Sequence, residues 1–115
     1  MRNEILELSF EFALDIIEFA EQLEEKRKFV VANQILKSGT SIGASVREAK
    51  NCESSADFIH KLKIAAKEAD ETEYWLLLCE KSRNYPHNPE LQNKILSIKK
   101  LLSSIISKMK SKKQY

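Results

Sequence analysis

The sequence predicts an all-α protein, a single domain over residues 1–115 that forms an antiparallel up-down-up-down four-helix bundle. The 115-residue chain contains only two glycines and two prolines, the residues that most disfavour helix interiors. Apolar residues recur at spacings of three and four along four segments, which is the pattern of amphipathic helices. The connections between these segments are short, so consecutive helices are expected to lie side by side and antiparallel.

The first helix is expected at about residues 4–25, with Asn3 as its N-cap. Two apolar stripes run along it, and the second stripe contains Phe10 and Ile17. Together the stripes cover about 200° of the helix surface, more than the ~100° that a surface helix requires. Either the bundle wraps this helix deeply, or the second stripe contacts another subunit. The remaining arc is acidic and is a poor candidate for contacting phosphates.

The second helix is expected at about residues 28–50 and contains both glycines, Gly39 and Gly43. A glycine inside a helix costs about 1 kcal/mol relative to alanine. Close approach of another helix would offset that cost, because glycine has no side chain to hold two backbones apart. The alternative is a break at residues 38–41. Apolar periodicity continues through this segment without a phase shift, so we expect one helix that packs tightly against a neighbour.

One face of the second helix is polar with the regularity of a core stripe. Its residues are spaced by three, four, four and three, which places them on one side of the helix. Two interpretations remain open. The stripe is either a solvated helix face or the lining of a groove or channel formed when copies of the bundle associate. The polar stripe consists of Gln34, Lys37, Ser41, Ser45 and Glu48.

The third helix is expected at about residues 55–83, with Ser54 at its start. The fourth is expected at about residues 89–110, with Asn88 as N-cap and Pro89 as first helical residue. From residue 99 onward the chain carries lysines and no acid. Such an end is either a lysine-rich helix terminus that frays into solvent or a basic handle for nucleic acid.

The sequence contains no signature of an enzyme. His60 and His87 are the only histidines, and neither follows a glutamate by three residues, as a dinuclear iron bundle would require. Neither Cys52 nor Cys79 has a histidine at metal-ligand spacing. We therefore expect no enzymatic activity, no cofactor and no metal. No apolar run reaches the ~20 residues that cross a bilayer, and two cysteines do not make a disulfide framework. No membrane partner and a cytoplasmic location are therefore expected.

A family resemblance is carried by two segments, NQILKSGTSIGASVREA at residues 33–49 and SADFIHKLKIAAKEADETEYWL at residues 55–76. They resemble the four helix bundle protein family, also called 23S rRNA intervening-sequence proteins. The resemblance implies a four-helix subunit that assembles as a ring-like homo-oligomer, a homopentamer. The related accessory variability determinants of diversity-generating retroelements look similar in fold and bind nucleic acid and reverse transcriptase through a basic surface. The resemblance therefore implies RNA or DNA as a partner.

The family's second helix carries a Gln, an Arg three residues later, and then Ser-Ile, Asn-Ile and Glu-Gly. Lys37 stands in place of the arginine, Ser45 in place of the asparagine and Ala49 in place of the glycine. Lysine keeps the charge but lacks the planar fork for bidentate contacts, so an arginine-type contact does not carry over to position 37. The positions that match the family are Gln34, Ser41, Ile42, Glu48 and, in the third helix, Glu71.

Two surfaces are therefore predicted. The nucleic-acid-binding surface consists of Lys37, Arg47, Lys108, Lys110, Lys112 and Lys113. The oligomer interface or pore consists of Gln34, Ser41, Ser45, Glu48, Glu71, Phe10 and Ile17. The competing hypothesis is a protein-interaction scaffold or adaptor that uses the acidic face of the first helix to hold a protein partner and binds no nucleic acid.

Overall fold

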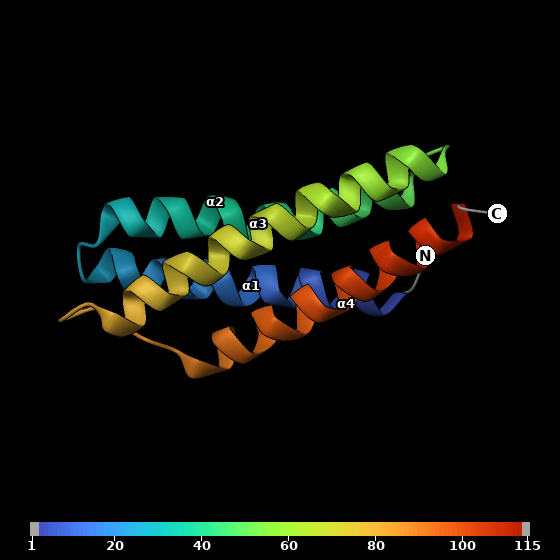
Figure 1. The fold of residues 1–115 in the computed structure, drawn as a ribbon. Coiled ribbons are helices and arrows are strands. Elements are labelled where there is room, and N and C mark those ends of the chain that lie inside the picture. The colour runs from blue at the N-terminus through green and yellow to red at the C-terminus, as the bar shows by residue number, and fades with distance from the viewer. Residues whose placement is uncertain (1–2, 114–115) are drawn as a thin grey trace.

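The structure is a computed structural model that describes residues 3–113. Within these residues it contains four helices, α1 (Asn3–Glu25), α2 (Phe29–Lys50), α3 (Ser55–Lys81) and α4 (Pro89–Lys113). Consecutive helices run in opposite directions and pack against each other along the chain, and α4 returns to contact α1 (Figure 1). The bundle is a rod of 53 × 22 × 20 Å. The predicted all-α antiparallel four-helix fold is confirmed.

The predicted helix limits differ from the observed ones by a few residues. The third helix ends at Lys81 rather than near residue 83, because Ser82 adopts an extended backbone with ψ of 139°. The second helix begins after Lys28, whose ψ of 59° is not helical. The first helix already includes Asn3, which we predicted to be the N-cap before its first residue. The fourth continues three residues beyond the predicted end, to Lys113, since no glycine or proline interrupts it and lysines suit a helix C-terminus.

The two glycines bring α1 and α2 into close contact. A Cβ placed on Gly39 would lie 2.8 Å from Cγ2 of Ile16, and a Cβ placed on Gly43 would lie 3.3 Å from the backbone oxygen of Ser9. The α2 helix runs through both positions without interruption. The predicted tight packing is confirmed, and the alternative of a break at residues 38–41 is wrong.

A buried hydrogen bond joins α2 to α3. Ser38 and Thr72 are both fully buried, and their hydroxyl oxygens lie 2.9 Å apart. Thr72 Oγ1 is also 2.7 Å from the backbone oxygen of Glu68. Because a threonine hydroxyl carries one proton, Thr72 donates to that carbonyl and accepts from Ser38. This pair was not predicted from the sequence.

The connections use the local chemistry that their residues offer. Ser54 accepts a hydrogen bond from the backbone N–H of Asp57 at 3.1 Å, so the predicted N-cap of α3 is confirmed. Asn88 likewise accepts from the backbone N–H of Glu90 at 3.1 Å. The α1–α2 link turns at Arg27, whose φ is 63°. Residues other than glycine seldom adopt this left-handed backbone conformation.

Candidate interaction surfaces

One face of α1 remains uncovered in the single chain. Phe10, Leu14 and Ile17 are 51%, 52% and 43% exposed. They border α2, because the neighbouring α1 residues Ser9 and Ile16 are the ones that approach the α2 glycines. The bundle therefore does not wrap α1 deeply enough to cover Phe10, Leu14 and Ile17. These three residues are called the α1 face below.

A second apolar patch lies between α3 and α4. Leu77 and Leu96 are 46% and 45% exposed. The antiparallel register places Leu77 level with Leu96, since Glu73 of α3 pairs with Lys99 of α4 at 2.8 Å. In the ring order of the four helices, the α1–α2 pair and the α3–α4 pair are opposite each other. The α3–α4 patch of Leu77 and Leu96 therefore faces away from the α1 face.

The polar stripe of α2 borders α3. Glu48 Oε1 lies 2.7 Å from Nζ of Lys61 on α3, and this hydrogen bond raises the pKa of Lys61. Ser45 is only 7% exposed within the single chain. Ser41 is half-buried and donates to the backbone oxygen of Lys37 at 2.6 Å. One end of the stripe is thus used by contacts within the chain, while Gln34 at the other end is exposed.

Three charged residues from α2 and α3 gather at the open end of that stripe. Burial raises the pKa of Glu68, repulsion from Glu71 raises it further, and the charge of Lys37 opposes the shift. Glu71 also accepts a hydrogen bond from the indole N–H of Trp75 at 3.3 Å. The structure therefore brings Lys37 and Glu71, two predicted site residues, around Glu68, which was not predicted.

A basic edge forms where the start of α3 meets the end of α4. The pKa of Lys63 is lowered, mainly because the neighbouring Lys110 ammonium disfavours a second positive charge there. Both lysines are exposed, and so is Lys108. Lys63 was missed because its partner lies far away in the sequence. The antiparallel arrangement of α3 and α4 was the signal that could have identified it. Lys63 and Lys110 are called the basic pair below.

The predicted nucleic-acid-binding residues do not form one continuous surface. Lys37 lies on the α3 side of α2, near Glu68. The guanidinium carbon of Arg47 lies 5.8 Å from the ring centroid of Phe10, on the α1 side of α2. Arg47 therefore covers part of the α1 face. The side chains of Lys112 and Lys113 lie outside the described residues.

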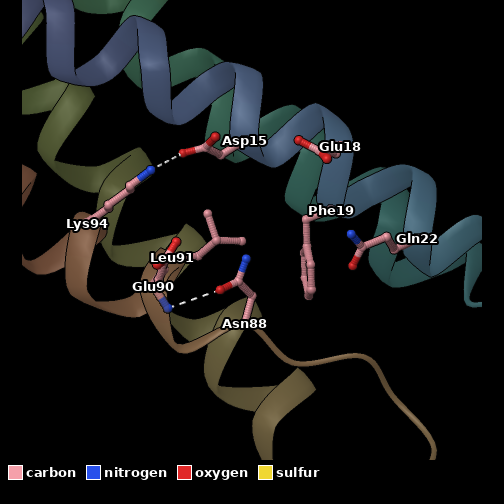
Figure 2. A pocket seen from close by; sticks show the side chains of 8 residues that line it. All are labelled: Asp15, Glu18, Phe19, Gln22, Asn88, Glu90, Leu91 and Lys94. Atoms are coloured by element: carbon pink, nitrogen blue, oxygen red, sulfur yellow. Dashed lines mark hydrogen bonds and ion pairs between the residues drawn. The ribbon is translucent and has the colours of Figure 1, made fainter.

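The seam between α1 and α4 is acidic but partly neutralised. Figure 2 shows Asp15 and Glu18 of α1 and Glu90 of α4 around a small open pocket of about 170 Å³. Lys94 of α4 reaches across the seam and pairs with Asp15. This hydrogen bond raises the pKa of Lys94. The acidic face of α1 therefore receives a compensating base from another helix, which the sequence of α1 alone does not reveal.

The fold defines a small four-helix-bundle protein with exposed apolar and charged residues on the outer faces of its helices. Residues 1–104 match the family model of the 23S rRNA-intervening sequence protein. The chain belongs to this family, and the resemblance noted from its motifs is confirmed. No helix within residues 3–113 is long and apolar enough to cross a membrane.

A crystal structure supports the same assignment. It is that of a protein of unknown function from the S23 ribosomal protein family of Bacteroides thetaiotaomicron VPI-5482. The two chains share 47% sequence identity and superpose with a TM-score of 0.84. The match covers 89% of this chain and 97% of that chain. No curated protein sequence matches the chain.

Proposed function

We propose that the protein is a non-enzymatic, cytoplasmic bundle that assembles with copies of itself into a ring-like homopentamer and binds RNA or DNA through its basic edges. The observation that carries the proposal is the pair of apolar surfaces on opposite sides of the bundle. Phe10 and Ile17 are about half exposed on one side, and Leu77 and Leu96 on the other. Exposed apolar side chains that gather on one surface are typical of protein interfaces.

Two different surfaces favour a ring over a two-fold dimer. In a two-fold dimer the same patch meets itself, whereas in a ring each subunit contacts its neighbours through two distinct patches. The α1 face and the α3–α4 patch supply such a pair. The number of subunits, five, comes from the family resemblance. Removing these side chains from water in each contact would contribute about 25 cal/mol for every Å² of apolar surface buried.

The nucleic-acid part of the proposal is supported by the basic pair. Two ammonium groups side by side favour an anion between them, because an anion removes their mutual repulsion. Assembly would repeat this pair in every subunit, and a polyanion that contacts several copies would bind more tightly than one copy allows. Phosphate contacts by lysine release counterions, so this binding is expected to weaken steeply with salt.

Light scattering tests the assembly. The expected mass is about five times the 13.3 kDa of one chain. A mass of 13.3 kDa at all concentrations would disprove self-association. The Ile17→Asp variant is expected to reduce the mass, because a charge would have to be buried in the contact. Replacing Glu18, which is also exposed on the same helix, with Gln is a matched control that should leave the mass unchanged.

A salt titration of oligonucleotide binding tests the second part. The variant with Lys63→Gln and Lys110→Gln should bind duplex nucleic acid more weakly and with a smaller salt dependence. The log–log slope should fall by about 0.9 for each phosphate that the variant no longer neutralises. The variant with Lys81→Gln and Lys100→Gln makes the same change in net charge away from the pair, since both lysines are exposed and lie at least ten residues from Lys63 and Lys110. If no oligonucleotide binds at ~50 mM salt, where such contacts are strong, the nucleic-acid proposal fails and the scaffold hypothesis takes its place.

A further inference from the structure

The end of the bundle opposite the basic pair carries a cleft between two connections. The α1–α2 link and the α3–α4 loop lie at the same end of the rod (Figure 1). Between them is an open cleft of about 400 Å³. The residues that line it are Lys26, Lys28, Asn84, Tyr85 and Pro86.

The cleft is cationic. Lys26 and Lys28 line one wall, and Arg27 lies between them in the sequence. Among the described residues, no acid lies within salt-bridge distance of any of the three. Glu80, at the end of α3 just before the loop, already contacts Lys81 at 3.6 Å and His87 at 3.7 Å. The three cations of the link therefore remain free to meet an anion.

The cleft also contains an aromatic ring that is held in place. Tyr85 packs against the hydrophobic core and is half-buried. The preceding Asn84 adopts a φ of 65°, which turns the chain there. The Nζ atom of Lys28 lies 4.8 Å from the centroid of the Tyr85 ring, the position of a cation that contacts the face of an aromatic ring.

This arrangement has the components of a site for a single strand. Proteins that bind single-stranded nucleic acid combine lysines or arginines along the backbone with aromatic rings on which bases stack. A base stacked on Tyr85 would take the place of the Lys28 ammonium over the ring. The displaced ammonium would then be available to a phosphate of the same strand, beside Lys26. A duplex offers no free base face for such stacking.

We propose that this loop-end cleft binds single-stranded nucleic acid, with one base stacked on Tyr85 and the adjoining phosphates held by Lys26 and Lys28. The inference rests on the proposed function for the class of ligand, but it concerns a separate site at the other end of the rod. RNA and DNA present the same base faces and phosphates, so both are suitable probes.

The test is fluorescence anisotropy with labelled hexamers of uridine and of thymidine at low salt. Tyr85→Leu is expected to weaken hexamer binding by about 5- to 150-fold, the effect of losing one stacked base. Tyr85→Phe keeps the ring and should bind within about twofold of the unaltered protein, since stacking is retained. Equal losses for both hexamers, or a larger loss for uridine, support the proposal.

A second variant avoids the core. Lys26→Gln with Lys28→Gln changes two side chains that line the cleft, and it should also weaken hexamer binding and reduce its salt dependence. Circular dichroism and thermal melting establish that each variant is folded. Hexamer binding that survives both Tyr85→Leu and the double lysine change would overturn the proposal.

The variant with Lys63→Gln and Lys110→Gln separates this inference from the proposed function. It should still bind hexamers. If it loses hexamer binding while Tyr85→Leu keeps it, the basic edge binds nucleic acid and the cleft does not. If longer duplexes bind and hexamers do not, the inference about the cleft fails while the proposed function stands. If no nucleic acid binds under any of these conditions, both proposals fail.

Discussion

Gly39 of α2 lies so close to Ile16 of α1 that a Cβ on the glycine would come within 2.8 Å of Ile16 Cγ2 and 2.9 Å of its Cγ1. Ile16 is fully buried, so it cannot move aside without disturbing the core. Gly39→Ala should therefore lower the free energy of unfolding by about 1–3 kcal/mol from overpacking, less the ~1 kcal/mol that alanine gains in helix propensity. Chemical denaturation measures the difference.

The matched control is Ala44→Gly on the exposed side of the same helix. It should cost about 1 kcal/mol through propensity alone. If Gly39→Ala raises the free energy of unfolding by as much as Ala44→Gly lowers it, α1 and α2 are not in tight contact at this point.

The buried hydroxyl pair gives a second prediction. Thr72→Val removes the acceptor that lies 2.9 Å from the Ser38 hydroxyl and should cost about 1–3 kcal/mol, because a buried polar group loses its partner. The double variant with Ser38→Ala and Thr72→Val should cost less than the sum of the two single variants. Strict additivity in a double-mutant cycle would contradict the coupling.

The α1–α2 link gives a third prediction. Arg27 holds a φ of 63° at a helix C-terminus, where the N–H of Lys28 donates to the backbone oxygen of Leu23 at 2.8 Å. Glycine is the usual residue at this position, and a left-handed residue with a side chain costs roughly 1–2 kcal/mol. Arg27→Gly should raise the melting temperature. Arg27→Ala removes the same charge but retains the Cβ, so it should be less stable than Arg27→Gly; equal stability would contradict the explanation.

The thiol of Cys79 gives a prediction about pH. Burial raises the pKa of this thiol from 9.0 to about 11. The folded state therefore favours the neutral thiol, and this contribution to stability is present below pH 9 and is lost as the pH rises towards 11. In a Cys52→Ser protein at pH 8, alkylation of Cys79 should require unfolding, since the thiolate is the reactive form. Rapid alkylation of the folded protein would contradict its burial.

The two apolar surfaces predict an unusual mixing experiment. Ile17→Asp disables the α1 face and Leu77→Asp disables the α3–α4 patch, so in a ring each variant alone should fail to assemble. Mixed together, they retain one intact pair of surfaces and should form a dimer of one copy of each, because head-to-tail contacts join two different patches. Light scattering measures this. If Leu77→Asp alone assembles normally, the contact does not use the α3–α4 patch.

Most of the fold could be predicted from the sequence because it depends on local patterns. The apolar periodicity gave all four helices, and the caps Ser54 and Asn88 were identified from their own chemistry and that of the next few residues. The end of α3 depended on a backbone angle, at Ser82, that spacing does not encode. The close approach at Gly39 was predictable because two glycines in a helix need a compensating contact.

The site residues were less predictable, because they depend on which helices face each other. Ser38 and Thr72 pair across two helices, and Lys63 meets Lys110 only through the antiparallel register of α3 and α4. Lys37 and Arg47 lie on the same helix, but Lys37 lies near α3 and Arg47 contacts Phe10 of α1. A helical wheel shows each face of a helix, yet it does not show which neighbour that face meets.

The rod is 53 Å long, and it carries cationic side chains near both ends, at the basic pair and at the loop-end cleft. Lys63 lies 18 residues before the end of α3, about 27 Å along the helix at 1.5 Å for each residue. A stacked strand of about eight nucleotides, at ~3.4 Å for each nucleotide, would therefore span the two sites. Affinity should therefore rise abruptly once the oligonucleotide is long enough to contact both sites. The distance between the two ends of the bundle would then set the minimum length of the strands that bind tightly.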